Sequence, residues 1–349
     1  MNKIRVVILG ATGTVGQRFV QLLDGHPWFE VAALAASDKS AGKQYRDAVS
    51  WKLDSPLPAY AASMVVTQCN PELDGRLAFS GLDASVAGDI EHSFAKAGYA
   101  VVSNSKNFRL EEDIPLVYPE INADHLALIE TQKIQRGFKD GFIVTNSNCS
   151  VMAFLPAIHV LEKLVGVESM TVTTMQAISG AGYPGVASMD VLGNVIPFIK
   201  DEEQKIQTEP LKILGRLQGN RIEPSHLRIS ASVNRVPVQD GHLASVSVKL
   251  KNKAAIPDII AALRSFQGVP QQLSLPLAPQ RPIIVHDLPD RPQPRMDILL
   301  EKGMAVSIGR IRKCDVLDYK FTGLVHNTIR GAAGAAVLNA ELLFAKDLL

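Results

Sequence analysis

Short apolar runs alternate with helical patterns along the N-terminal part of the chain. Runs rich in β-branched and aliphatic residues predict buried strands at 4–9, 29–36, 64–66, 77–80, 99–103 and 142–145. Helical spacing of apolar residues follows several of these runs, at 17–23, 85–97 and 122–135. Strands that alternate with helices form parallel sheets covered on both faces. This part of the chain is therefore predicted to be an α/β domain with a parallel sheet.

The pattern changes near residue 149. A mostly buried helix is predicted over 151–164, and Pro156 must start or kink a turn there. Longer β-rich stretches follow at 167–178, 229–237, 242–250, 305–313 and 315–325, with helical patterns at 201–216 and 256–266. This texture is typical of an α+β domain with a larger, partly antiparallel sheet.

Two later segments bear on the domain organisation. The proline-rich stretch 270–294 is predicted to be an extended surface segment or arm. Segment 330–349 is predicted to be a helix that returns to the first domain, because its first residues are small enough for close packing. We therefore expect one domain at 1–148, completed by 330–349, and a second at 149–329.

Composition narrows the class of protein. Apolar residues make up 46% and charged residues 20% of the chain, and the formal net charge is +1. That balance is ordinary for a globular protein and favours neither nucleic acid nor a membrane as partner. The N-terminal apolar run is short, and no segment approaches about 20 uninterrupted apolar residues. Three widely spaced cysteines and the lack of CxxC or HExxH patterns argue against disulfides and a metal site. A cytoplasmic location is expected.

A glycine-rich loop follows the first predicted strand and precedes a predicted helix. In that position, glycines allow a tight turn and a close approach of the backbone to a pyrophosphate at the helix N-terminus. A plain strand–helix turn is the alternative. The expected cofactor contacts are Gly10, Thr12, Gly13, Thr14, Val15 and Gly16.

The end of the second predicted strand bears on the choice of cofactor. NAD-binding domains usually place an acidic residue there. Here Ser37, Lys39 and Ser40 are suited to a 2′-phosphate, whereas Asp38 is suited to accept a hydrogen bond from a ribose hydroxyl. NADP is the predicted cofactor.

Cys149 is the candidate nucleophile among the three cysteines. It follows a predicted strand and a polar turn, and it precedes an apolar helix that Ser147 or Asn148 can cap. The positive end of a helix dipole favours the thiolate. Cys69 and Cys314 are interpreted as small buried hydrophobic residues. Together with a nicotinamide site, a thiolate indicates aldehyde chemistry through a thioester.

His242 is the candidate proton carrier. It stands beside a Gly-Asp turn, seven residues after Arg235. A near-neutral pKa would suit this histidine to take the thiol proton and to protonate the leaving oxygen.

Several long motifs together resemble the aspartate-semialdehyde dehydrogenase family, in the branch found in archaea, fungi and some bacteria. They are GATGTVGQ at the start, SNCS around Cys149, QAISGAGYPG, RVPVQDGH and LVHNTIRGAAGAAVLNAEL. The resemblance covers essentially the whole chain. It implies an N-terminal Rossmann NADP-binding domain and an α+β catalytic and dimerisation domain of the glyceraldehyde-3-phosphate-dehydrogenase-like type.

The resemblance also implies a reaction. NADPH would reduce L-aspartyl 4-phosphate to L-aspartate 4-semialdehyde with release of inorganic phosphate, on the route to lysine (through diaminopimelate), methionine and threonine. A homodimer or homotetramer is implied as well.

Site residues follow from the matched motifs. Cys149 matches the acyl-enzyme nucleophile, His242 the acid/base residue and Gln176 the residue that orients the acyl group. Asn148 would support the thioester site. The substrate-binding residues are Arg235 for the α-carboxylate, Glu202 (or its neighbour Glu203) for the ammonium, and Lys205 and Arg109 for phosphate. The matched contacts near the nicotinamide are Ser179, Gly180, Gly182 and Asn327.

Two local departures and two alternatives accompany this interpretation. Ser147 stands where the family usually has proline, and Asp38-Lys39 stands where relatives often carry arginine. A malonyl-CoA reductase of the same branch would keep the cysteine and the histidine and replace phosphate with coenzyme A. A non-catalytic dinucleotide sensor is the alternative from another class.

Overall fold

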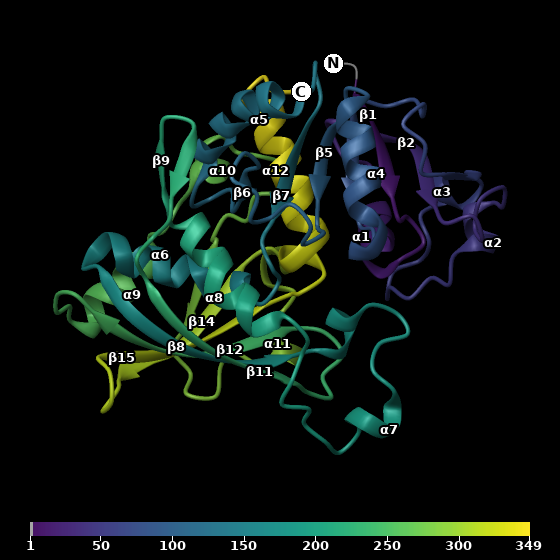
Figure 1. The fold of residues 1–349 in the computed structure, drawn as a ribbon. Coiled ribbons are helices and arrows are strands. Elements are labelled where there is room, and N and C mark those ends of the chain that lie inside the picture. Colours follow the sequence, from purple (N-terminus) through teal and green to yellow (C-terminus); the bar gives the residue numbers. More distant parts are fainter. Residues whose placement is uncertain (1–2) are drawn as a thin grey trace.

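Seven parallel strands form the first sheet in the computed structural model, which describes residues 3–349 (Figure 1). Their order in the sheet is β3-β2-β1-β4-β5-β7-β6, and each neighbouring pair is parallel. The strands are β1 (Ile4–Leu9), β2 (Phe29–Ala36), β3 (Val66–Gln68), β4 (Leu77–Ser80), β5 (Ala100–Ser103), β6 (Leu116–Val117) and β7 (Phe142–Asn146). The predicted parallel sheet is confirmed, although β3 starts later than expected and the two-residue β6 was too short to be predicted.

Alternate side chains of each strand enter two different cores, because successive side chains point to opposite faces of a sheet. Val6 and Ile8 belong to the core beneath α1 (Thr14–Leu22), whereas Val7 and Leu9 belong to the core beneath α4 (Ala84–Lys96). Burial on both faces explains why these strands read as continuous apolar runs. The other helical elements of this part are α2 (Tyr45–Ala48), α3 (Ala59–Ala62), the 3-10 turn Ala123–Ala127 and α5 (Leu128–Arg136).

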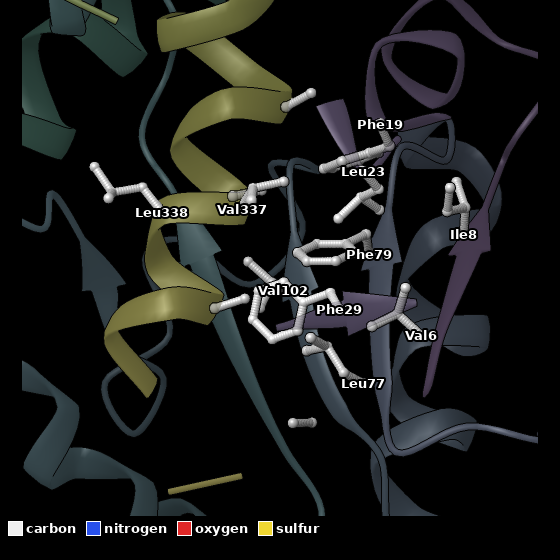
Figure 2. Packing of buried hydrophobic residues seen from close by; sticks show 14 of the residues in the cluster. Val6, Ile8, Phe19, Leu23, Phe29, Leu77, Phe79, Val102, Val337 and Leu338 are labelled. Atoms are coloured by element: carbon white, nitrogen blue, oxygen red, sulfur yellow. The ribbon is translucent and has the colours of Figure 1, made fainter. Parts of the chain in front are cut away.

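The C-terminal helix α12 (Gly334–Ala345) packs into the core of the first sheet and contacts α1. Figure 2 shows Val337 on the side of this helix that faces Phe79. Close packing needs a small residue at Gly334, where a Cβ would lie 2.6 Å from the Met304 sulfur. A π-helical turn, Ile329–Ala333, precedes the helix.

We propose that residues 330–349 complete the first domain at 1–148 and that 149–329 forms the second. Residues 1 and 2 of the proposed first domain lie outside the described residues.

The second sheet is mixed, in the order β11-β8-β12-β15-β14-β13. Its central strand β12 is antiparallel to both neighbours, while β11 pairs parallel with β8 and β13 with β14. This confirms the predicted, partly antiparallel sheet. The strands are β8 (Val167–Gln176), β11 (Arg228–Arg235), β12 (His242–Leu250), β13 (Ile283–His286), β14 (Val306–Lys313) and β15 (Tyr319–Val325).

One face of this sheet is covered by helices, whereas the part of the other face formed by β8 and β12 is not (Figure 1). Residues of α6 (Leu155–Leu164), α8 (Glu202–Ile213) and α9 (Ile256–Arg264) share its apolar core with alternate residues of β8 and β12. Thr171, Thr173 and Ser245 point to the uncovered face and are exposed. The helical elements are the 3-10 turns Val151–Ala153, Ile178–Ala181 and Leu300–Gly303, with α6 (Leu155–Leu164), α7 (Ser188–Val191), α8 (Glu202–Ile213), α9 (Ile256–Arg264), α10 (Val269–Gln272) and α11 (Pro294–Asp297). A small hairpin contains β9 (Arg216–Gln218) and β10 (Arg221–Glu223).

Two expectations for this part need adjustment. The proline-rich stretch is not simply a surface arm, because Ile283–His286 joins the edge of the second sheet and Leu275 is buried in the first core. The helix predicted over 151–164 is divided, and α6 begins at Leu155 with Pro156 in its first turn, where proline is tolerated.

Candidate active site

A pocket of about 300 Å³ lies where the first sheet meets the second. Its walls come from the start of α1, the segments after β4, β5, β7 and β8, the start of α8 and the turn before α12. Such a position, at the carboxyl ends of parallel strands, is where open α/β sheets bind ligands. The predicted residues that line it are Thr14, Val15, Arg109, Asn148, Cys149, Ser179, Gly180, Gly182, Glu202, Lys205 and Asn327.

Cys149 lies in a turn directly after β7. The side-chain oxygen of Asn148 accepts hydrogen bonds from the backbone N–H groups of Ser150 (2.9 Å) and Val151 (3.4 Å). Asn148 therefore stabilises the turn around Cys149, whereas the prediction was that it or Ser147 caps the apolar helix. The α-helix itself begins only at Leu155, so Cys149 is not in its first turn and the predicted helix-dipole effect on the thiol is wrong.

Burial dominates the electrostatics of Cys149. Loss of solvation raises the pKa of this thiol to about 11, and the nearby charge of Glu202 acts in the same direction. The positive charges of Arg109, Arg235 and Lys205 lower the pKa and partly offset these effects. The thiol thus has cations around it, but burial keeps its pKa above the usual value.

His242 lies buried at the start of β12. Its Nδ1 accepts a hydrogen bond from the backbone N–H of Ala177 (3.1 Å), so the neutral ring carries its proton on Nε2. Within residues 3–349, Nε2 is buried without a hydrogen-bond partner. Burial first, then the charge of Arg235, lowers the pKa of His242 to about 3. The expectation of a near-neutral pKa is therefore wrong, and the ring is a neutral hydrogen-bond donor at Nε2.

Gly180 brings His242 and Arg235 close to the pocket. A Cβ on this glycine would lie 2.9 Å from His242 Nε2 and from Arg235 Nη1, so any side chain would displace both groups. Arg235, near the end of β11, is 5% exposed and donates from Nη1 to the carbonyl oxygen of Ala177 (2.6 Å). The backbone of Ala177 therefore holds the side chains of both His242 and Arg235.

Glu202 is hydrogen-bonded to three other residues of the predicted site. Its carboxylate accepts hydrogen bonds from Asn148 Nδ2 (3.0 Å), Gln176 Nε2 (3.3 Å) and Lys205 Nζ (2.7 Å). Burial raises its pKa, but the Lys205 charge and the hydrogen bonds outweigh burial, so the net shift is downward and Glu202 is ionised. Glu203, the alternative, is exposed on the other side of α8.

The side chain of Arg109 is held in one orientation by two hydrogen-bond acceptors. Its Nη1 donates to Glu209 Oε1 (2.9 Å) and its Nη2 to the carbonyl oxygen of Asn104 (2.7 Å). Glu209 was missed from the sequence, as was Lys106, which lines the pocket and pairs with Asp201 at 2.7 Å. The spacing of Glu202, Lys205, Glu209 and Lys212 on one helical face was the signal that could have revealed Glu209.

The glycine loop has the form expected of a phosphate-binding turn. Gly10 adopts φ +76°, and a Cβ at Gly16 would lie only 2.2 Å from the Gly10 carbonyl oxygen. Helix α1 therefore packs against the loop at a distance that only glycine allows. Gly13 supplies no side-chain cap, so the first N–H groups of α1 stay available to a pyrophosphate. These observations fit a dinucleotide in the cradle that also contains Thr12.

The turn after β2 carries the predicted 2′-phosphate residues. Ser37 and Lys39 are exposed and Ser40 is partly exposed. Asp38 accepts a hydrogen bond from Gln68 Nε2 (3.0 Å), which engages the carboxylate that would compete for a ribose hydroxyl.

The remaining predicted cofactor-side residues lie on the opposite wall of the pocket. Asn327 Nδ2 donates to the Ser179 hydroxyl (2.8 Å), while its Oδ1 accepts from the backbone N–H of Gly241 (2.8 Å). Asn327 therefore ties the segment after β8 to the turn that precedes His242. Ser179 and Gly182 face the start of α1 across the pocket.

Residues 3–349 contain neither a candidate metal site nor a candidate membrane-spanning helix. No group of three or more His, Cys, Asp or Glu residues in that range is arranged to hold a metal ion. None of the helices described is long and apolar enough to cross a membrane.

Comparison with family models divides the chain into two matched parts. A model described as the NAD-binding domain of semialdehyde dehydrogenase matches residues 5–129, and one described as the semialdehyde dehydrogenase dimerisation domain matches residues 159–330. Cys149 lies between the two matches.

Several relatives named aspartate-semialdehyde dehydrogenase align over nearly the full chain. One from Candida albicans is 48% identical, with all of both chains covered, and one from Archaeoglobus fulgidus is 45% identical, with 99% of each covered. A solved structure of the Candida albicans aspartate-semialdehyde dehydrogenase with NADP has a TM-score of 0.91 at 44% identity, covering 100% of each chain. A Vibrio cholerae structure at 24% identity, with a TM-score of 0.79, shares the fold.

Proposed function

Because this chain belongs to the aspartate-semialdehyde dehydrogenase family, we propose that it reduces L-aspartyl 4-phosphate to L-aspartate 4-semialdehyde and phosphate with NADPH. The observation that carries the proposal is the pocket beside the glycine loop, which is lined by a partly buried thiol, by Arg109 and Lys205, and by the Glu202 carboxylate, with Arg235 next to the lining residue Gly180. An acyl phosphate that bears an ammonium and a carboxylate complements that set of charges.

We propose that Cys149 forms the covalent bond to substrate. Its sulfur attacks the acyl carbon, the bond to the phosphate oxygen breaks, and the thiol proton leaves with the phosphate group, so a thioester and inorganic hydrogen phosphate result. Arg109 and Lys205 receive the phosphate, and their charges, with that of Arg235, favour the thiolate. NADPH, when bound, supplies the hydride that reduces the acyl group.

His242 supports this chemistry as a donor. Its Nε2 carries the proton, so it is suited to donate a hydrogen bond to an oxygen that gains negative charge on the acyl carbon. Taking the thiol proton would require a free lone pair on the ring, and the N–H of Ala177 already occupies the one on Nδ1.

The substrate's amino-acid end is assigned to the opposite wall. We propose that Glu202 receives the ammonium and Arg235 the α-carboxylate, because both are charged, buried and held in place by neighbours. Gln176, whose amide donates to Glu202, orients the acyl group. Malonyl-CoA offers no ammonium, so a buried Glu202 disfavours the reductase alternative. The curated relatives also carry the aspartate-semialdehyde dehydrogenase name over their full length.

A homo-oligomer in the cytoplasm is part of the proposal. The segment around α7 projects from the second domain in Figure 1 and exposes large apolar side chains. Met189 is 92% exposed and Leu192 is 70% exposed in the single chain. Together with the uncovered face of the second sheet, this segment supports a dimer or tetramer.

The test compares the wild-type protein with Cys149→Ser. We expect phosphate-dependent reduction of NADP by aspartate semialdehyde in the wild type and a loss of at least about a thousandfold in the variant. NADP binding, measured by fluorescence titration, should stay within about twofold, because the glycine loop is untouched. Cys314→Ser is the matched control and should keep its turnover. Wild-type activity with malonyl-CoA alone, or unchanged turnover in Cys149→Ser, would overturn the proposal.

A further inference from the structure

Helix α8 presents a row of charged side chains to the rest of the molecule. Glu202, Lys205, Glu209 and Lys212 recur at helical spacing and lie on one face. The first two line the pocket, whereas Glu209 is only 1% exposed and does not line it. A buried carboxylate this close to the nucleophile needs partners, because an unpaired buried charge is costly.

Glu209 finds those partners in two segments that are distant in the sequence. Its Oε1 accepts from Arg109 Nη1 (2.9 Å). Its Oε2 accepts from the backbone N–H of Asn148 (2.5 Å) and from the Ser147 hydroxyl (3.3 Å). One carboxylate therefore joins the residue before Cys149 to an arginine in the wall of the pocket.

Lys212, one helical turn later, fixes the same segment by its backbone. Its Nζ donates to the carbonyl oxygens of Arg109 (2.9 Å), Glu111 (2.6 Å) and Ile114 (2.7 Å). The segment that carries Arg109 is thus attached to α8 both at its main chain and at its guanidinium. Such double attachment removes most of the freedom of a long arginine side chain before any ligand arrives.

Arg109 still has donors to offer. A guanidinium has five N–H donors, and Glu209 and Asn104 engage one each. Among the described residues, Nε of Arg109 is buried without a partner, while the residue lines the pocket with Cys149 and Lys205. An anion in the pocket would satisfy that N–H group.

We propose that Glu209 is a positioning residue that aligns Arg109 with the Cys149 turn, so that phosphate binds next to the thiol. This inference rests on the proposed function for the identity of the anion. A carboxylate that only stabilised the fold would be replaceable by apolar packing. Here the contacts of Glu209 end at the nucleophile turn on one side and at the candidate phosphate ligand on the other.

The first experiment measures Michaelis constants in Glu209→Gln. Arg109 and the Asn148 N–H donate to different oxygens of Glu209, and in glutamine one of these positions becomes an NH2 group that cannot accept, so one attachment is lost. We expect the KM for phosphate to rise about tenfold, while the KM for aspartate semialdehyde stays within about twofold. Glu203→Gln, on the exposed side of the same helix, is the matched control and should change neither. A phosphate KM within twofold of the wild type would overturn the proposal.

A double-mutant cycle separates positioning from general destabilisation. If Glu209 acts on phosphate through Arg109, then Glu209→Gln should add less than about twofold to the phosphate KM in an Arg109→Gln background. The double variant also removes both members of the buried pair, so no unpaired charge threatens its folding. Additive effects on the phosphate KM would contradict the proposal.

The pH dependence of Cys149 alkylation tests the arrangement without turnover. Iodoacetamide reacts with the thiolate, so the rate, followed on the Cys149 peptide by mass spectrometry, rises as pH passes the thiol pKa. Glu209→Gln leaves the Arg109 charge uncompensated, and that charge lowers the Cys149 pKa. We expect the midpoint to move down by roughly half a pH unit. An unmoved midpoint would refute the link between Glu209, Arg109 and Cys149.

These experiments distinguish a failure of the proposed function from a failure of the inference about Glu209. If the wild type lacks phosphate-dependent activity, the proposed function fails, and the alkylation midpoint still decides the role of Glu209. If the wild type is active but Glu209→Gln matches it in phosphate KM and midpoint, only the inference about Glu209 fails.

Discussion

The glycine loop and the Cys149 pocket are built in different ways. The loop is a stretch of seven consecutive residues, Gly10 to Gly16, whose function depends on backbone N–H groups and on the absence of side chains. The pocket depends on charged and polar side chains from the segments after β5 and β7, from α8 and from the turn before α12. The loop therefore has no room for a Cβ at Gly10 or Gly16, whereas the pocket depends on keeping its charges.

This difference shows where each half of the site is vulnerable. In the loop, the shortest approach is between two backbone positions, so a single methyl group forces a helix to move. In the pocket, Glu202 alone binds Asn148, Gln176 and Lys205, so one neutralised carboxylate disturbs three neighbours at once. Substitutions in the two halves should accordingly affect different kinetic constants.

Apart from loss of the proposed nucleophile itself, the largest effect is expected from Glu202→Gln. Loss of the charge removes the proposed ammonium ligand and the partner of Lys205, so kcat/KM for aspartate semialdehyde should fall about fiftyfold. The KM for NADP should stay within about twofold, because the loop is unchanged. Steady-state kinetics with each substrate varied in turn provides the measurement.

Glu203→Gln is the control for that prediction, since Glu203 is exposed on the same helix. It should leave both constants unchanged within about twofold. If Glu203→Gln caused the larger loss, the assignment of the ammonium to Glu202 would be wrong.

A smaller effect, on the other half of the site, is expected from Gly16→Ala. The added Cβ would meet Gly10 O at 2.2 Å and Ala11 Cα at 2.6 Å, so α1 must shift away from the loop. We expect the KM for NADP to rise about tenfold and the free energy of unfolding to fall by about 1–3 kcal/mol. NADP kinetics and urea unfolding check the two parts.

Gly88→Ala in helix α4 is the matched comparison. There a Cβ would meet no backbone atom within 4 Å and only the Asn107 side chain, at 3.1 Å from Nδ2. Helix propensity favours alanine over glycine, so stability should be kept or improved. Equal losses in Gly16→Ala and Gly88→Ala would show that close packing of the loop is not what matters.

The smallest effect is expected from Lys39→Ala. This exposed cation is proposed to contact the 2′-phosphate, and exposed ion pairs contribute little. We expect the KM for NADP to rise about threefold at low salt and the KM for NAD to stay the same. A wild-type enzyme that prefers NAD, or equal changes for both dinucleotides, would remove the case for a 2′-phosphate site at Ser37, Lys39 and Ser40.

Local patterns predicted the first sheet well. Val6 to Leu9 and Leu77 to Ser80 are buried on both faces of the sheet, so each strand can be recognised from a run of consecutive, mostly apolar residues. The short β6 and the exact position of β3 escaped prediction, because two or three residues carry too little pattern. Ile283–His286, inside the proline-rich stretch, became an edge strand only because β14 lies beside it.

In the candidate site, too, local motifs predicted some features, whereas others depended on tertiary packing. Motifs placed Cys149, Asn148, Glu202 and Lys205, which lie together in one pocket. The electrostatics could not be predicted in the same way, because pKa values depend on burial and on neighbours that are distant in the sequence. The helix start suggested an acidic thiol, yet burial raises the pKa of Cys149 to about 11 and lowers that of His242 to about 3.

The amino-acid sequence by itself determined the alternation of strands and helices and the glycine loop, and it singled out Cys149 as the candidate nucleophile. Each of these depends on residues that are neighbours along the chain. Only the tertiary structure decided which nitrogen of His242 carries the proton, that Arg109 is held by Glu209, and that Glu202 rather than Glu203 faces the thiol. The reason is physical: burial and hydrogen bonding set charge and orientation, and the groups responsible come together only when the two sheets pack around one pocket.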